Sequence, residues 1–177
     1  TESTQTLTKQ TKVTPEEGVT IYAQEVEYLP EHKLELKGDI EFVHGPYKAQ
    51  SDSAVIDQTT DTAELLGDIK LSSPDLLLTG DRASMNMTSE KISVTNAKFS
   101  NPKTSVNGEA SEISRPDEKI LIIHDGLFSS CPPEERDWAF AAEKITLDKE
   151  LGFGHANNTR FLINDTPVLY IPWFSFP

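Results

Sequence analysis

Apolar and charged residues alternate along residues 32–43, which read HKLELKGDIEFV. A period of two is typical of a strand with one buried face. The apolar parity consists of Leu34, Leu36, Ile40 and Phe42. Gly38 lies on the same parity in mid-strand, where a missing side chain marks a bulge or a bend. We therefore predict a bent strand whose apolar face looks into a curved wall.

The same pattern recurs in five units along the chain, each made of two apolar-patterned stretches joined by a polar turn. The predicted strand pairs are 22–29 with 34–43, 49–57 with 63–71, 76–87 with 92–99, 106–114 with 120–128, and 138–147 with 153–163. The joining segments have the lengths of hairpin turns. A curved antiparallel stack of hairpins is the predicted result.

Each second strand carries a small or turn-prone residue near its middle. These residues are Gly38, Gly67, Asn96, Gly126, and Asn157 or Asn158. Bends at equivalent places fold long strands over, which predicts an all-β fold, an antiparallel jelly-roll or open sandwich built from successive hairpins. Periodicity does not show whether the facing sheets touch, so an open trough and a closed sandwich with a dry core both fit.

One segment also has helical character, because residues 133–144 place good helix formers behind an N-terminal proline. The repeat register predicts a strand from about Trp138 instead. We follow the register, since tertiary context overrides weak propensity, and allow a helical turn near Glu134.

The two ends differ from the repeats. Residues 1–20 are rich in Thr, Gln, Lys and Glu and have little periodicity, which predicts a flexible arm. Residues 21–163 are the expected β domain. Residues 164–177 are aromatic and proline-rich without a closing element, as in a connection toward a further part of a longer protein.

Charge and cysteine content narrow the function classes. The 177 residues carry 16 Lys and Arg against 29 Asp and Glu, a net charge of −13, which disfavours binding to nucleic acid. No apolar run reaches the roughly 18 residues of a spanning helix, and no signal peptide begins the chain, although a signal could have been removed. Cys131 is the single cysteine, so it invites a partner outside this chain.

No group of residues predicts catalysis, a metal site or a cofactor. The four histidines, His32, His44, His124 and His155, fall in four different units without metal-ligand spacing. Asp57 and Asp61 could suggest calcium, but their loop lacks EF-hand spacing, and capping of a turn is the better interpretation. A carbohydrate-active enzyme on a jelly-roll would need two facing carboxylates about 5 to 9.5 Å apart, and no such pair is indicated.

The apolar face is the remaining candidate site. Its predicted lining is Leu34, Leu36, Ile40, Phe42, Leu65, Ile69, Leu71, Ile92, Val94, Phe99, Ile120, Ile122 and Phe128. An acyl chain gains about 0.8 kcal/mol for each CH₂ that leaves water, so a trough of this kind could hold a lipid without polar contacts. An open trough also leaves sheet edges that can accept a strand from a neighbour.

The end of the chain resembles a known family. It resembles the OstA/LptD family of lipopolysaccharide-assembly proteins. The resemblance lies in the order of four features: Cys131, Trp138, the strand pair ITLDKELGFGHANNTRFLI and the ending TPVLYIPWFSFP. The GDI motifs at 38–40 and 67–69 resemble the OstA-type periplasmic domain that this family shares with LptA. The resemblance covers nearly all of residues 21–177, and the proline-aromatic ending is its more specific part.

The resemblance implies a V-shaped β jelly-roll on the periplasmic side of the outer membrane of a Gram-negative bacterium, preceding a membrane barrel absent from this chain. Such a domain receives lipopolysaccharide from an LptA-like bridge and guides it toward the outer membrane, and the full complex includes the barrel and an LptE-type lipoprotein plug. The resemblance implies that the domain is not an enzyme. Cys131 matches a cysteine that forms an interdomain disulfide, while the other family cysteines are missing. The edge formed by Ile21, Tyr22, Ala23 and Val26 would receive the bridge protein's strand.

The negative charge matters for this interpretation, because lipopolysaccharide phosphates are also negative. We expect the acyl chains to enter the trough while sugars and phosphates stay in solvent. A photo-crosslinking residue at Ile40 or Ile122 should then capture lipopolysaccharide, and one at the outward-facing Glu41 should not. The alternative is a structural or interaction β-sandwich with no lipid groove.

Overall fold

A computed structural model describes residues 5–13 and 18–177. The chain divides into two compact units, residues 1–89 and residues 90–177, which are described separately. The first unit contains β1 (Gln5–Val13), β2 (Thr20–Leu29), β3 (Lys33–His44), β4 (Tyr47–Asp57), β5 (Thr62–Ser73) and β6 (Leu76–Asn86). The second contains β7 (Ile92–Ser100), β8 (Asn107–Arg115), β9 (Ile120–Ser129), β10 (Trp138–Asp148), β11 (Phe153–Ile163) and β12 (Thr166–Phe176).

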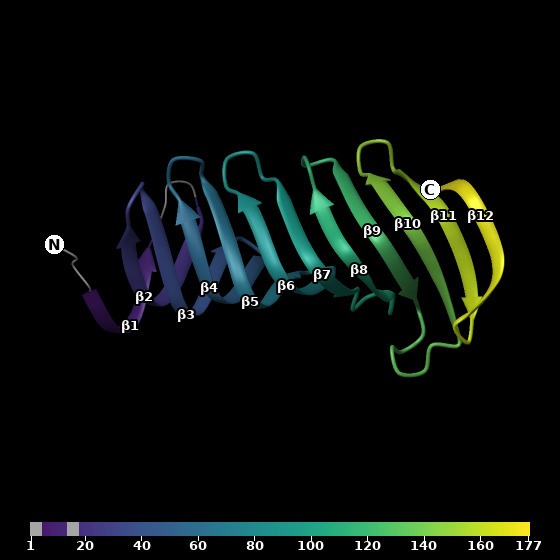
Figure 1. The fold of residues 1–177 in the computed structure, drawn as a ribbon, viewed down its shortest axis with the longest axis horizontal. Coiled ribbons are helices and arrows are strands. Elements are labelled where there is room, and N and C mark those ends of the chain that lie inside the picture. Colours follow the sequence, from purple (N-terminus) through teal and green to yellow (C-terminus); the bar gives the residue numbers. More distant parts are fainter. Residues whose placement is uncertain (1–4, 14–17) are drawn as a thin grey trace. The chain divides into compact units, whose positions relative to one another are not determined.

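Within each unit, every strand pairs antiparallel with its neighbour in sequence (Figure 1). The predicted all-β, antiparallel jelly-roll class built from successive hairpins is therefore confirmed. The regular secondary structure of the described residues consists of strands alone, and none of it is a helix long and apolar enough to cross a membrane.

The segment with helical character follows the repeat register. β10 begins at Trp138, the residue at which the register predicts a strand. Before it, the Glu135 N–H donates to the Pro132 carbonyl at 3.0 Å, which closes one turn. The good helix formers that follow are strand residues, because β9 and β11 pair with β10 on both sides.

The GDI motifs of unit 1 form the bends. Gly38 and Asp39 both have positive φ angles, 78° and 46°, and the β3–β4 register shifts between Lys37 and Ile40. Gly67 and the following aspartate repeat this conformation in β5. Two consecutive left-handed residues form a bulge that bends the strand and returns the isoleucine to the apolar face.

Glycine is required at the first position of each bulge by its neighbours as well as by its backbone. A Cβ on Gly38 would lie 2.5 Å from Oε1 and 2.9 Å from Cβ of Gln24. A Cβ on Gly67 would lie 2.5 Å from Oδ2 and 3.1 Å from Cβ of Asp52. The bulge of one strand thus packs directly against a side chain of the strand before it.

In unit 2 the bends occur without a shift in register. Asn96, Asp125 and Asn158 have φ angles of 51°, 49° and 48°, while the pairings on either side of them stay in phase. At Asn96 and Asn158 the residue predicted to bend the strand is therefore the one with the left-handed conformation. In β9 the left-handed residue is Asp125, immediately before the expected Gly126.

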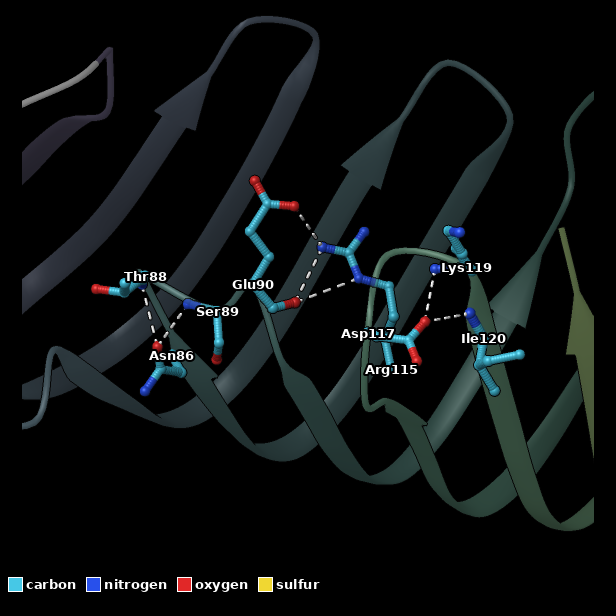
Figure 2. A network of polar contacts seen from close by, with 8 residues as sticks. All are labelled: Asn86, Thr88, Ser89, Glu90, Arg115, Asp117, Lys119 and Ile120. Carbon is cyan, nitrogen blue, oxygen red and sulfur yellow. Dashed lines mark hydrogen bonds and ion pairs between the residues drawn. The ribbon is translucent and has the colours of Figure 1, made fainter. Parts of the chain in front are cut away.

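Aspartate or asparagine side chains cap the hairpin turns. In unit 1, Oδ1 of Asn86 accepts the N–H groups of Thr88 and Ser89 at 3.0 and 2.8 Å (Figure 2). Oδ1 of Asp57 accepts the N–H groups of residues 59 and 60 at 2.9 and 3.3 Å. Asp61 accepts the Thr88 hydroxyl at 2.9 Å. Asp57 therefore caps its turn, as the sequence indicated, whereas the Asp61 carboxylate binds a side chain of the following turn.

The first turns of unit 2 use the same device together with an arginine. Oδ1 of Asp117 accepts the N–H groups of Lys119 and Ile120 at 2.8 and 2.9 Å (Figure 2). Arg115 donates through Nη2 to the carbonyl oxygen of Glu90 at 3.0 Å and lies 3.6 Å from its carboxylate. Both contacts shape the ends of the strands, where backbone groups would otherwise lack partners.

Strands also form in the two end segments. β1 lies inside the segment predicted to be a flexible arm, and β12 lies inside the segment predicted to be an open connection. β12 pairs with β11 through a tight turn at Asn164 and Asp165, which both have positive φ angles. The remaining predicted arm residues 1–4 and 14–17 fall outside the described part of the chain, and the boundaries at 20 and 163 stay predictions.

Candidate functional site

The pairing register defines one apolar face in unit 1, which we call the unit 1 inner face. Residues directly opposite each other in antiparallel strands share a face. The register groups Ile21 with Phe42, Ala49, Leu71 and Leu78; Val26 with Leu36, Ala54, Leu65 and Ala83; and Leu34 with Ile56, Ala63 and Met85. The seven lining residues predicted in this unit all lie on this face, either by their alternation along the strand or by their position directly after a bulge. They are Leu34, Leu36, Ile40, Phe42, Leu65, Ile69 and Leu71.

Most of the predicted lining of the unit 1 inner face is buried. Leu36, Ile40, Leu65 and Ile69 each expose 1% of their surface, and Leu34 and Phe42 are also buried. Leu71 is half-buried. These side chains form a packed core in the structure, and their contact with lipid stays a prediction.

The corresponding face of unit 2 consists of three rows of cross-strand partners. An aliphatic row contains Val94, Ile113, Ile123, Ile145, Ala156 and Phe174. An aromatic row contains Phe99, Gly108, Phe128, Phe140, Phe161 and Leu169. Between them, at the bend, lie Gly126, Ala142, Thr159 and Ile171. We call these three rows together the unit 2 inner face.

The aromatic row is partly open. Phe128 stacks on Phe140 with ring centroids 5.4 Å apart, and Phe140 lies 5.0 Å from Phe161. Trp138 packs edge-on against Phe140 at 5.9 Å. All four rings are half-buried, unlike the sealed aliphatic side chains of unit 1. Unit 2 therefore presents aromatic surface that a further apolar group can contact.

Two of the predicted lining residues lie on the opposite face. Ile122 pairs with Ser114 and Thr146, whereas Ile123 pairs with the buried Ile113 and Ile145. Ile120, two residues before Ile122, shares its parity. The reason is that residues 120–123 read ILII, so both parities are apolar and the alternation carries no information about the face. The prediction that Ile120 and Ile122 face inward is wrong.

The other predicted residues of unit 2 have inner-face positions. Val94 is buried, and Ile92, Phe99 and Phe128 are half-buried. Sequence reasoning missed the inward residues of β10 and β11, chiefly Trp138, Phe140, Ile145 and Phe161. The alternation of Trp138 with Phe140 before the bend, and of Ile145 with Leu147 after it, is the signal that could have found them.

The predicted partner edge is not a free edge. The four predicted edge residues of β2 all pair with β1. Ile21 pairs with Val13, Tyr22 with Lys12, Ala23 with Thr11, and Val26 with Gln5. The polar composition of this segment suggested an arm, but threonine is a good strand former and the open edge of β2 offers backbone partners. The outer strand of unit 1 is therefore β1, and the assignment of the edge to β2 is wrong.

Polar contacts hold the backbone around Cys131. The Asn107 side chain donates from Nδ2 to the Cys131 carbonyl at 2.7 Å. The buried Ser129 hydroxyl accepts the Cys131 N–H at 3.0 Å and donates to the Trp138 carbonyl at 2.7 Å. The thiol is free and half-buried. The β9–β10 loop thus holds the cysteine in a defined position, and its disulfide stays a prediction.

The outward residue of the proposed crosslinking pair in unit 1, Glu41, lies away from the unit 1 inner face. Glu41 pairs with Gln50 on the other parity of β3 and β4, and its carboxylate lies 3.3 Å from Nζ of Lys48. Over the described ranges 5–13 and 18–177, no three His, Cys, Asp or Glu side chains are grouped so that they could hold a metal ion.

Comparison with known proteins identifies relatives of one kind. The LPS-assembly protein LptD of Hahella chejuensis is 33% identical over 147 residues, which are 83% of this chain and 18% of that protein. LptD of Pseudomonas savastanoi pv. phaseolicola is 32% identical over 142 residues, 80% of this chain and 15% of that protein. The chain therefore spans less than a fifth of the length of these relatives. No protein-family model matches it.

The fold has a counterpart among solved structures. LptH of Pseudomonas aeruginosa, described as the LptA-homologous periplasmic component of the lipopolysaccharide transport device, superposes with a TM-score of 0.52 at 16% identity. The match covers 67% of this chain and 94% of LptH, and it shows a shared LptA-like jelly-roll. The sequence matches over 80 to 83% of the chain and this common fold show that the chain belongs to the family of the LPS-assembly protein LptD.

Proposed function

We propose that this chain is the N-terminal periplasmic domain of a lipopolysaccharide translocon and guides the acyl chains of lipopolysaccharide along its apolar inner face toward the outer membrane. The relatives named as LPS-assembly proteins support the process. The aromatic row of unit 2 supports the mode of contact, since its stacked rings on the inner face are only half-buried.

Hydrophobic burial is the driving force in this proposal. Each CH₂ moved from water to the apolar face contributes about 0.8 kcal/mol, so a contact of a few methylenes exceeds the thermal energy several-fold. The net charge of −13 opposes close approach of phosphate groups. Sugars and phosphates therefore stay in solvent while the acyl chains lie against the inner face.

The partners belong to the same proposal. An LptA-like bridge protein delivers the lipid by adding a strand to the outer edge of unit 1, which the structure assigns to β1. Cys131, held in the β9–β10 loop, forms a disulfide with a cysteine elsewhere in the full-length protein. The family's own C-terminal barrel and an LptE-type lipoprotein complete the assembly.

Photo-crosslinking tests the proposal with neighbouring residues of one strand. Phe161 lies on the unit 2 inner face, and Arg160, the residue before it, points to the other face and is exposed. A photo-reactive amino acid at Phe161 should capture lipopolysaccharide, while the same amino acid at Arg160 should not. Equal capture at both positions would contradict the assigned face, and no capture at either would contradict the lipid contact itself.

The unit 1 inner face favours a second role for part of the chain. Most of its aliphatic side chains are buried, as expected of a structural β-sandwich that only supports its neighbours. A hydrophobic fluorescent probe distinguishes the two roles. Probe binding that is lost on replacing Phe140 by serine supports the lipid surface, and a chain that binds no probe supports the scaffold.

A further inference from the structure

β12 has a partner strand on one side only. In the part of the chain that the structure describes, it pairs with β11 and with no other strand, so its second edge is open (Figure 1). Val168, Leu169, Tyr170 and Trp173 expose 54 to 58% of their surface. We call these four side chains the β12 edge patch. Exposed apolar residues grouped in this way are typical of an interaction surface.

The β12 edge patch reaches both faces of the sheet. Leu169 lies opposite Phe161 on the unit 2 inner face, whereas Tyr170 and Trp173 pair with polar residues of β11 on the other face. Val168 falls where the β11–β12 register shifts. The apolar side chains therefore surround the edge instead of lining one face. A fluid medium can meet such an edge from both sides at once.

Contacts within unit 2 hold both aromatic side chains of the patch in place. The Tyr170 hydroxyl donates to Oδ1 of Asn158 at 2.7 Å. The Trp173 ring stacks on His155 with ring centroids 5.8 Å apart. Both residues are thus ordered while more than half of the surface of each stays exposed. Little side-chain entropy is lost when another molecule covers rings that are already held.

The charge pattern selects the kind of molecule that covers the patch. Residues 166–177 contain no Asp, Glu, Lys or Arg, and no other stretch of equal length in the chain is free of them. The rest of the chain carries the whole net charge of −13, which repels anionic surfaces. An uncharged edge with a tyrosine and a tryptophan matches the boundary of a zwitterionic lipid bilayer, where amphipathic aromatic rings are enriched.

Two prolines argue against a further β-strand as the occupant. Pro167 and Pro172 have no N–H group to donate to a neighbouring strand, and prolines on an edge strand hinder edge-to-edge pairing. The other unpaired backbone groups of the open edge would be costly in hydrocarbon. A contact at the level of the lipid headgroups avoids this cost, because water completes their hydrogen bonds there.

We propose that the β12 edge patch is a membrane-contact site, which seats this edge of unit 2 in the interface of a zwitterionic lipid bilayer. The occupant is the bilayer surface and not a single acyl chain. The inference does not depend on the proposed function, because a chain that captures no lipopolysaccharide at Phe161 can still bind vesicles through β12.

Vesicles of phosphatidylcholine provide the test. Partitioning of the 177-residue chain is measured by co-sedimentation with sucrose-loaded vesicles. Leu169→Glu should weaken partitioning by about tenfold, because the bilayer then meets a charge in place of a half-exposed leucine. Leu77→Glu is the matched control, since Leu77 exposes 46% of its surface in unit 1, and its replacement should leave partitioning unchanged. Equal losses for the two variants would overturn the assignment to β12.

Quenching by brominated phosphatidylcholine locates the contact. The chain has two tryptophans, so the fluorescence of Trp138→Phe comes from Trp173 alone, and that of Trp173→Phe comes from Trp138 alone. The vesicles should quench the emission of Trp138→Phe strongly and that of Trp173→Phe much less. Quenching confined to Trp173→Phe would overturn the placement of β12 at the bilayer.

A second copy of the chain is the rival occupant. If the wild-type chain does not partition onto phosphatidylcholine vesicles, the proposal is overturned. If it also forms a dimer in sedimentation velocity that Leu169→Glu abolishes, the β12 edge patch is a self-association surface instead. Vesicles of phosphatidylglycerol should bind the chain less than phosphatidylcholine does at low ionic strength, because both surfaces are negative. A preference for the anionic vesicles would overturn the charge argument and with it the choice of a zwitterionic surface.

Discussion

Replacement of Gly38 by alanine tests the account of the GDI bulges. At a φ of 78° an L-residue is strained, which costs about 1 kcal/mol. The new Cβ would also lie 2.9 Å from the Cβ of Gln24, an atom so close to the backbone that the strand itself has to move. Overpacking of this kind costs typically about 1–3 kcal/mol, so the total loss in free energy of unfolding should be about 2–4 kcal/mol.

The structure supplies a control for the backbone term. Gly45 has a φ of 58°, and a Cβ built on it meets no atom within 4 Å. Gly45→Ala should therefore lose only about 1 kcal/mol. Denaturant unfolding followed by far-UV circular dichroism is the suitable assay, because both tryptophans, Trp138 and Trp173, belong to unit 2 and do not report on unit 1. A loss for Gly38→Ala no larger than that for Gly45→Ala would refute the packing argument.

Three further predictions concern unit 2. Ile123→Ala should lower the free energy of unfolding by about 2–5 kcal/mol, because it removes buried side-chain atoms from the aliphatic row. Ile122→Ala should lower it clearly less in the same unfolding assay. Similar losses for the two variants would contradict the face assignment. Ser129→Ala should lower the free energy of unfolding by about 1–3 kcal/mol, because a buried hydroxyl with two hydrogen-bond partners is lost. Ser130 is an exposed neighbour, so thermal unfolding of Ser130→Ala should match that of the wild type. Asp117→Ala should lower the free energy of unfolding by about 1 kcal/mol, because it removes the acceptor of two turn hydrogen bonds. Asp117→Asn keeps an acceptor oxygen and should retain most of the stability. Equal losses for the two variants would argue against a capping role.

The comparison of the two units also bears on how a trough can be both stable and available. Unit 1 buries most of its inward aliphatic side chains against its own residues, which stabilises the fold. Unit 2 leaves four aromatic rings half-buried, and this apolar surface is the one that the proposed lipid contact uses. The trough along the whole domain stays a prediction.

The sequence alone determined the order and direction of β2 to β11 and, to within one residue, the places where every second one of these strands bends. These features are local, because a period of two needs only neighbouring residues and a left-handed bulge needs only a glycine or asparagine in mid-strand. Tertiary pairing decided the rest. The run of apolar residues at 120–123 has no preferred face until β8 and β10 pair with it. The polar segment of β1 becomes a strand because the edge of β2 has unpaired backbone groups, and that requirement lies outside the segment's own residues. The exposure of the aromatic row likewise depends on which side chains meet across the fold, which no periodicity along one strand records.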